Sequence, residues 1–422
     1  MDGNNRNHFT LSWPKGQPFN NNPMKRRDFL RASALASTSL LVPSFLPAAF
    51  GGRMSGGRFG KILVVIQLSG GNDGLNTIIP YRNDAYYRSR PNLAIPAAEV
   101  LPVGDELGFN PALQALRPLY DGGLLSIINS VGYPNPDRSH FRSMDIWHTA
   151  SDSSQYLSTG WLGRYLDSEC AGCEQPYHAL ELDDSLSLAL KGREHNGFAM
   201  SDARQLKRTT DNRFLQAVGK AAHDHEDGEQ AAYLYKVMVD TQSSADYLFE
   251  QSKVYPSKAP YPLTPFGQDL KKVAELITAD TATRVYYVNL TGFDTHANQK
   301  NRQGRLLKQL AEGMQAFVMD LKQNGLLDDT LIMAFSEFGR RVKQNASGGT
   351  DHGTANNVFL LGGQLKQPGF FNPGPNLLDL DEGDLKYQVD FRSLYATILE
   401  NWLGVKAPKD ILGGEFGVLG MV

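Results

Sequence analysis

Five short polar segments carry the side chains that could do chemistry in this chain. Each combines a carboxylate, an imidazole, a guanidinium or a hydroxyl with glycine or proline, or with a second polar residue. The candidate residues are Asp73, Arg138, Ser139, His140, Asp294, His296, Glu337, Arg340 and His352. A mixed set of oxygen and imidazole ligands suits Zn²⁺ or Mn²⁺, and a serine hydroxyl beside such an ion is a candidate nucleophile.

The tripeptide Asp294-Thr295-His296 has the spacing of a pair of metal ligands. In extended backbone, residues two apart point to the same side, so Asp294 and His296 could bind one ion together. The alternative is a helix cap followed by an incidental histidine. The presence of His352, Glu337 and Asp73 in similar segments favours the metal site.

Ser139 follows a loop with two prolines and precedes a predicted helix. The free amides and the dipole at a helix N-terminus stabilise an alkoxide or a bound anion. A serine that only caps the helix would occupy the same position, and the spacing fits both roles.

The glycine-rich segment 69–74 does not fit a dinucleotide site. Ser69 occupies the first position of the Gly-x-Gly-x-x-Gly pattern, and Asp73 would bring negative charge to the pyrophosphate. The chain also lacks the Gly-x-Ser-x-Gly, His-Glu-x-x-His and P-loop signatures. The chain therefore lacks the signatures of a serine esterase, a zincin and a P-loop NTPase.

The elements that position these residues alternate along the chain. Apolar runs predict buried strands, and 3.6-residue periodicity predicts helices between them. The strands are 61–68, 124–128, 284–290, 330–335 and 357–361, and the helices are 110–120, 230–251, 268–279, 302–324 and 390–402. This order predicts a three-layer α/β sandwich with a largely parallel central sheet. Since ligands bind beyond the carboxyl ends of such strands, the polar segments should meet at one edge.

The less regular part, about 165–265, predicts a helical or irregular insertion or cap within a domain that spans 51–422. The run His-Asp-His-Glu-Asp at 223–227 is more typical of a solvated face than of a metal site. Cys170 and Cys173 are interpreted as a local disulfide rather than a redox centre.

The first 50 residues have the character of a targeting segment. They carry six basic and two acidic residues, a net +4, which leaves −7 of the total −3 for the remainder. A twin-arginine pattern at 25–31, a weakly apolar stretch at 32–42 and small residues at 47–49 predict a signal peptide, with Met1 or Met24 as the start. We therefore expect an exported, periplasmic protein without a transmembrane segment in its mature form.

The overall charge also bears on partners. Lys and Arg total 42 against 45 Asp and Glu, and this balance argues against nucleic acid as a principal partner.

The motifs at 68–76, 138–141, 292–296, 336–340 and 350–354 resemble those of the alkaline phosphatase-like superfamily. More closely, the chain is similar to a family of twin-arginine-exported bacterial proteins of unknown function placed within that superfamily. The resemblance implies an exported metal-dependent hydrolase of small anionic esters of the phosphate or sulfate type.

The same resemblance implies roles for individual residues. Ser139 stands at the position of the nucleophile, and Asp73 at that of a ligand of one metal. Asp294 and His296, with His352, would hold the other metal. Glu337 replaces an Asp of the first metal site, and Arg138 or Arg340 could pair with the oxygens of the attacked group. The cofactor would be one or two divalent ions, Zn or Mn.

Two departures from the superfamily pattern stand out. Asp294 and His296 are two residues apart rather than four, and Phe338 follows Glu337 where a histidine is usual. The protein would then bind a single ion, or His140 would supply the missing nitrogen. An alternative function is a non-catalytic binding or assembly protein of the cell envelope, with an envelope protein as partner.

Overall fold

A nine-stranded sheet forms the centre of the computed structural model. The structure describes residues 60–169, 176–211 and 229–422, and of residues 229–238 the backbone alone. These residues belong to one compact unit, Gly56–Val422. The strands lie in the order β11-β5-β10-β9-β1-β8-β6-β7, and β14 also pairs with β5. Their bounds are β1 Ile62–Ser69, β5 Leu125–Gly132, β6 Ala179–Glu181, β7 Phe198–Ala199, β8 Val285–Thr291, β9 Thr330–Phe335, β10 Asn356–Leu361, β11 Gly369–Phe370 and β14 Val389–Asp390.

Strand direction brings the polar segments to one edge. β1 pairs in parallel with β8 and β9, whereas β10 runs antiparallel to β9 and β5. The residues that precede β10 therefore reach the same edge as those that follow β1, β5, β8 and β9. All five predicted strands are confirmed, and the sheet is largely parallel as expected.

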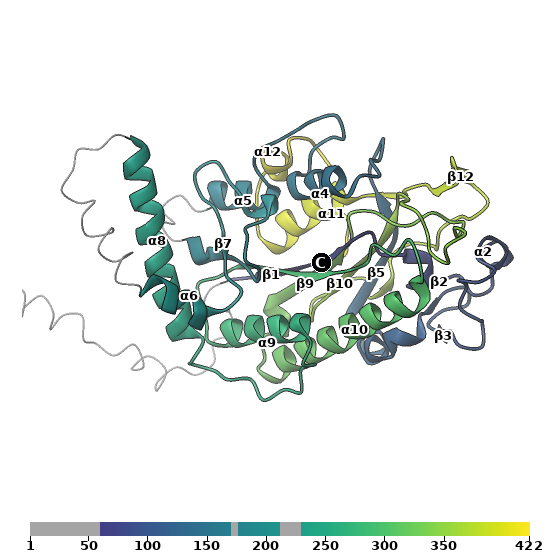
Figure 1. The fold of residues 1–422 in the computed structure, drawn as a ribbon, viewed down its shortest axis with the longest axis horizontal. Coiled ribbons are helices and arrows are strands. Elements are labelled where there is room, and N and C mark those ends of the chain that lie inside the picture. The colour runs from purple at the N-terminus through teal and green to yellow at the C-terminus, as the bar shows by residue number, and fades with distance from the viewer. Residues whose placement is uncertain (1–59, 170–175, 212–228) are drawn as a thin grey trace, which may run out of the picture. The chain divides into compact units, whose positions relative to one another are not determined.

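Helices cover both faces of the sheet (Figure 1). On one face lie α3 (Arg117–Asp121), α9 (Pro265–Thr278) and α10 (Gln299–Gln323), and on the other α4 (His140–Thr149), α5 (Trp161–Glu169), α11 (Phe391–Thr397) and α12 (Pro408–Leu412). The alternating residues of β1 divide between the two cores, with Val64 and Ile66 in the first and Leu63 and Val65 in the second. Burial on both faces explains why β1 is a continuous apolar run. The three-layer α/β architecture is confirmed.

Two predicted helices are irregular. The segment predicted at 110–120 is a kinked 3-10 helix, Pro111–Leu116, that leads into the short α3. The helix predicted at 390–402 is α-helical only through Thr397 and continues as a π-helical turn, Ile398–Trp402. Prolines at positions 111 and 118 start new turns, which accounts for the first difference.

The region 165–265 contributes to the sheet as well as to helices. β6 and β7 extend the sheet beyond β8, while α6 (Ala203–Thr210) contacts α8 (Glu229–Gln251). Strands of two or three residues leave no periodic signal in the sequence. The 223–227 run, the two cysteines and the signal segment lie outside the described residues.

Small elements complete the described unit. They are β2 (Ile78–Ile79), β3 (Leu101–Pro102), β4 (Gly108–Phe109), α2 (Asp84–Ser89) and the pair β12 (Leu380–Asp381) and β13 (Asp384–Leu385). Among the described helices, none is long and apolar enough to cross a membrane.

Candidate metal centre

The turn after β1 packs directly against the loop after β8. Gly70 and Gly71 have φ angles of 115° and 68°, a region that L side chains rarely adopt. A Cβ atom on Gly70 would lie 2.4 Å from the backbone nitrogen of Asp294. These two glycines therefore let the loops of neighbouring strands meet at the carboxyl edge.

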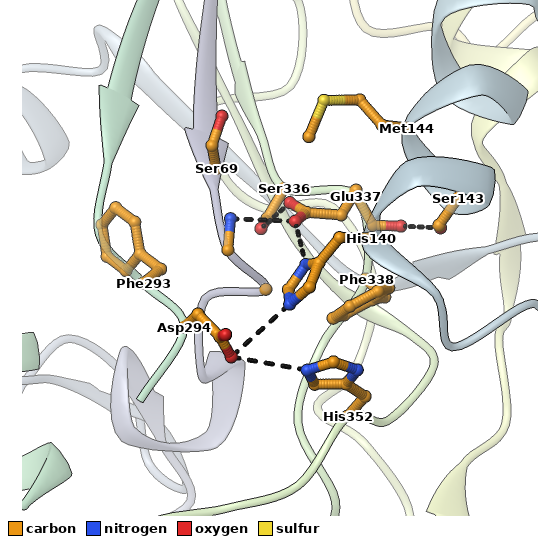
Figure 2. Close-up of polar contacts among 12 residues, drawn as sticks. Ser69, His140, Ser143, Met144, Phe293, Asp294, Ser336, Glu337, Phe338 and His352 are labelled. Atoms are coloured by element: carbon orange, nitrogen blue, oxygen red, sulfur yellow. Dashed lines mark hydrogen bonds and ion pairs between the residues drawn. The ribbon is translucent and has the colours of Figure 1, made fainter. Parts of the chain in front are cut away.

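Three histidines from three segments surround one carboxylate oxygen. Figure 2 shows two of them, His140 and His352, beside Asp294. The Nε2 atoms of His140, His296 and His352 lie 3.5, 3.0 and 3.4 Å from Asp294 Oδ1. His140 begins α4, His296 follows β8, and His352 precedes β10. The structure thus brings together His140, Asp294, His296 and His352, which the sequence analysis assigned to a metal site.

The opposite nitrogen of each imidazole faces an oxygen acceptor. His140 Nδ1 lies 2.7 Å from Glu337 Oε1, and His352 Nδ1 lies 2.7 Å from the carbonyl oxygen of Arg138. His296 Nδ1 lies 3.2 Å from Asp351 Oδ1. An acceptor at Nδ1 selects the tautomer with the proton on that nitrogen, so the neutral rings present Nε2 lone pairs to the centre.

These lone pairs fit a divalent ion. Nε2 of His140 is buried and has no hydrogen-bond partner among the residues that the structure describes. His140, Asp294 and His352 offer ligand atoms within 4.8 Å of one another. Ligands at about 2.0–2.1 Å in a tetrahedron around Zn²⁺ are about 3.4 Å apart, close to the 3.5 and 3.4 Å that separate His140 and His352 from Asp294.

His296 lies close to a second histidine of the centre. Its Nε2 atom is 2.9 Å from that of His352. Two lone pairs at this separation repel unless a proton or a cation lies between them. The arrangement of His296 therefore also favours a positive charge at the centre.

A buried arginine fixes the central carboxylate. The guanidinium of Arg340 donates to Asp294 Oδ1 at 2.8 Å and to the carbonyl oxygens of Gly70, Gly71, Phe293 and Thr350. Partial burial alone would raise the pKa of Asp294, but the hydrogen bond and charge of Arg340, with the charges of His296 and His140, lower it to about 2. Asp294 is therefore ionised at neutral pH.

The environments of two histidines shift their pKa values in opposite directions. The hydrogen bond to Glu337 raises the pKa of His140, against the effect of burial. Burial lowers the pKa of His352 despite its hydrogen bond to the Arg138 carbonyl oxygen. Protonation of His140 would therefore compete with a bound ion at the centre, whereas His352 favours the neutral, ligating form.

Glu337 lies behind His140 rather than at the centre itself. Its side chain is fully buried and accepts hydrogen bonds from the Gly70 amide at 2.8 Å, from His140 and from Ser336 at 3.0 Å (Figure 2). A carboxylate that orients a ligating imidazole is a common partner in metal sites. The structure therefore gives Glu337 the geometry of a positioning group.

Asp73 is held in a separate, buried ion pair. Its Oδ2 atom lies 2.5 Å from Arg90 Nη1 and also accepts from the amide of Gln299. Among the contacts of the described residues, none joins Asp73 to the three histidines. The structure does not bring Asp73 and Glu337 together as the two carboxylates of one metal site.

Ser139 lies at the rim of the centre, exposed at the N-cap of α4 and without a side-chain capping bond. Its neighbours on both sides contact the centre, because the Arg138 carbonyl oxygen binds His352 and His140 approaches Asp294. The Arg138 guanidinium, 42% exposed, pairs with buried Asp384.

Phe338 fills the position where the resemblance expects a histidine. Its ring centroid lies 4.8 Å from that of His140 and 4.9 Å from that of His352. An apolar ring therefore supports the back of both imidazoles.

Three residues that contact predicted site residues were not themselves predicted. Asp351 is adjacent to His352 within a recognised motif, so its position next to a ligand could have marked it. Arg90 and Gln299 contact Asp73 from distant segments, and no spacing rule connects them.

The comparisons with known proteins give a family and a set of distant structures. The family described as "Protein of unknown function (DUF1501)" matches residues 127–405. No curated protein matches the chain. Solved structures that match include a lipoteichoic acid synthase from Listeria monocytogenes, 11% identical, with a TM-score of 0.39 over 84% of this chain and 75% of that chain.

Two further matches are a protein in the alkaline phosphatase superfamily from Vibrio parahaemolyticus and a sulfatase from Pseudoalteromonas sp. The first is 11% identical with a TM-score of 0.38, over 93% of this chain and 78% of that one. The second is 12% identical with a TM-score of 0.38, over 94% and 75%. Since the family match spans about two thirds of the 422 residues, the chain belongs to the family described as "Protein of unknown function (DUF1501)".

Proposed function

We propose that the protein is a hydrolase of phosphate- or sulfate-type esters that depends on one divalent metal ion, Zn or Mn, held by His140, Asp294 and His352 together with His296. One observation carries this proposal. Each of the three imidazoles has its own oxygen acceptor at Nδ1, while the three Nε2 atoms surround Asp294 Oδ1. A bound ion would lower the pKa of a nearby hydroxyl and offset the negative charge of the attacked group.

Ser139 is the proposed nucleophile. Its Oγ atom would attack the phosphorus or sulfur atom of the ester. The P–O or S–O bond to the alcohol oxygen would then break, and the alcohol would leave with the proton of the serine hydroxyl. Water would then cleave the seryl ester, which releases phosphate or sulfate and restores the hydroxyl. The first-turn amides of α4 and the half-exposed guanidinium of Arg138 are the groups available to bind the anionic oxygens.

Arg340 has a different role in this proposal. Its three nitrogens already donate to the loops around the centre and to Asp294. It would therefore act as a positioning residue, which holds Asp294 ionised and in place, rather than contact substrate.

One observation favours the alternative of a non-catalytic binding or assembly protein of the cell envelope. The Asp73 carboxylate, a metal ligand by resemblance, is instead neutralised by Arg90. If ester hydrolysis required a second ion, this chain could not catalyse it. The protein would then keep the fold and a single structural ion.

Metal content and turnover test the proposal together. We expect the purified full chain to bind one Zn or Mn per molecule. Asp294→Asn should lose the ion, while Asp73→Asn, the matched carboxylate control, should retain it. Metal analysis by plasma mass spectrometry measures both, and retention of the ion in Asp294→Asn would contradict the assigned site.

Hydrolysis is measured with 4-nitrophenyl phosphate, bis(4-nitrophenyl) phosphate and 4-nitrophenyl sulfate. We expect Ser139→Ala to reduce kcat at least about 100-fold because the nucleophile is gone, and Ser243→Ala, an exposed serine in α8, to leave it unchanged. Full metal occupancy without Ser139-dependent turnover would favour the non-catalytic alternative.

A further inference from the structure

Asp384 is a buried carboxylate that holds two arginines beside the candidate metal centre. Its Oδ2 atom accepts from Nε of Arg138 at 2.8 Å and also from Nη2 of the same guanidinium. Its Oδ1 atom accepts from Nε of Arg341 at 3.1 Å. The side chain of Asp384 has no exposed surface, whereas both arginine side chains are partly exposed. One buried carboxylate thus joins two guanidinium groups that reach it from the surface.

The hairpin of β12 and β13 fixes the place of Asp384. Glu382 and Gly383 form its two-residue turn, with φ angles of 47° and 87°. Two positive φ angles are typical of the type I′ turn that closes tight hairpins. Leu385, the next residue of β13, is buried, and its carbonyl oxygen accepts from the Thr354 hydroxyl. The hairpin is thereby attached to the segment that precedes β10.

Arg138 connects Asp384 to His352. The guanidinium of Arg138 binds the buried carboxylate, and its carbonyl oxygen lies 2.7 Å from His352 Nδ1. Within the described part of the chain, residues 134–138 make no backbone-to-backbone hydrogen bond, so side-chain contacts must hold this loop. The ion pair with Asp384 therefore anchors the carbonyl oxygen that selects the tautomer of His352.

Arg341 connects the same carboxylate to a second histidine. Its backbone amide donates to the carbonyl oxygen of Asp351 at 3.0 Å. The side chain of Asp351 is the Nδ1 acceptor of His296, at 3.2 Å. Each oxygen of Asp384 is thus linked, through one arginine, to the acceptor of one imidazole.

The burial of Asp384 argues for a positioning role. Taking a carboxylate out of water costs free energy that ion pairs offset only with good geometry, and apolar residues of similar volume often stabilise a fold as well. Glu382, the other carboxylate near Arg138, lies 3.8 Å away and stays exposed. A buried charge of this kind can be retained because it fixes one arrangement of polar groups. Asp384 fits that use, since both of its arginines lead to acceptors of the centre.

We propose that Asp384 is a positioning residue for the histidines of the centre. Through Arg138 it holds His352 with the proton on Nδ1, so that Nε2 is free to bind an ion. Through Arg341 it supports His296 in the same way, over a longer connection. Asp384 would touch neither the ion nor the ester. Its effect on metal binding rests on the proposed function, whereas the tautomer of His352 is a property of the metal-free chain.

Nitrogen-15 NMR of the full chain, labelled at histidine, tests this role in EDTA at pH 8. Protonated and unprotonated ring nitrogens have well-separated shifts, so the spectrum shows the tautomer of each neutral imidazole. His352→Gln identifies the His352 signals by their loss. We expect His352 of the unchanged chain to carry its proton on Nδ1 alone, and Asp384→Asn to populate both tautomers of this ring.

Metal affinity is the second measurement. Asp384→Asn should weaken Zn binding by about three- to tenfold, less than the loss expected for a direct partner of a ligand. Asp320→Asn is the matched control, because Asp320 is also buried and accepts from three side chains, near the far end of α10. It should lower stability but change neither the His352 tautomer nor the Zn affinity.

A second variant protects the test against misfolding of Asp384→Asn. Arg138→Met removes the guanidinium, keeps the carbonyl oxygen and alters a partly exposed side chain, so it should fold. It should populate both tautomers of His352 as Asp384→Asn does. The double variant should show no greater effect, because the two residues act as one pair. A single, unchanged His352 tautomer in both single variants would overturn the inference.

The two measurements separate this inference from the proposed function. If the unchanged chain binds neither Zn nor Mn, the proposed function fails, while mixed tautomers in Asp384→Asn would still support the positioning role. An unchanged tautomer together with metal binding and Ser139-dependent turnover would refute the positioning role and leave the hydrolase intact.

Discussion

At the scale of single residues, the centre differs from the resemblance in how its histidines are supplied. Phe338 stands where a histidine is usual, and His140 enters from α4 to the same neighbourhood, with Glu337 behind it at 2.7 Å. In the proposed site, the carboxylate would orient a ligand instead of binding the ion. Such a partner fixes the tautomer and increases the basicity of the imidazole.

Glu337→Gln should weaken metal affinity by about 10- to 100-fold, because a neutral amide holds the His140 tautomer less firmly. Titration against a chelating dye measures the dissociation constant. Glu415→Gln, at an exposed carboxylate, is the control and should bind metal as the unchanged chain does. Unaltered affinity in Glu337→Gln would mean that His140 does not bind the ion.

At the scale of elements, α4 is the helix that positions the site. Ser139 and His140 lie at its N-terminus, and His148 anchors its far end against the sheet. His148 Nε2 lies 2.9 Å from Gln67 Oε1 of β1, and Tyr287 of β8 donates to the same oxygen. The helix is thus tied to two central strands in the second core.

This anchor predicts a dependence of stability on pH. Burial lowers the pKa of His148 to about 4, below its ordinary value of 6.5. Well above pH 6.5 the imidazole is neutral in both the folded and the unfolded chain, so it does not make the free energy of unfolding depend on pH. As pH falls from 6.5 to 4, the unfolded chain takes up a proton that the folded chain does not, so the free energy of unfolding should fall by about 1.4 kcal/mol per pH unit.

Urea unfolding of the unchanged chain and of His148→Gln at pH 7 and pH 5 isolates this contribution. The stability difference between the two proteins should shrink at pH 5, because the variant lacks the group that titrates. His178→Gln, at a partly buried histidine, is the control and should retain the full loss of stability. Parallel pH profiles for the unchanged chain and His148→Gln would show that His148 is protonated in the folded protein.

At the scale of the whole molecule, the sheet gathers segments from positions 70 to 352 at one edge. The antiparallel direction of β10 is essential to this arrangement, since it delivers His352 from the residues before the strand. A parallel β10 would carry those residues to the opposite edge of the sheet. The centre is therefore a product of strand direction as much as of residue type.

Export concerns the chain as a whole, and the twin-arginine segment predicts it. We expect the double substitution Arg26→Lys and Arg27→Lys to retain the protein in the cytoplasm of a bacterial host, because the pathway recognises the arginine pair. Arg31→Lys keeps the pair and should be exported. Cell fractionation with immunoblotting measures the distribution, and export of the double variant would contradict the predicted pathway.

The sequence by itself determined the architecture and the residues at the strand ends. A doubly buried strand must be apolar throughout, as β1 is, and a helix that covers one face must repeat every 3.6 residues, as α9 does. Such local regularities also located the polar segments that follow or precede the strands, and so the candidates His140, Asp294, His296 and His352.

Only the tertiary structure decided which candidate residues lie at the centre and which lie beside or away from it. Asp73 forms an ion pair with Arg90, and Glu337 forms a hydrogen bond with His140, 197 positions earlier in the chain. The short strands β6 and β7 and the kinked helix at Pro111 likewise depend on neighbours that local periodicity does not encode. The orientation of a buried charge is set by whichever opposite charge or donor packs against it, and packing partners are distant in sequence. For this reason residue types could suggest a metal site, whereas its members and their roles required the fold.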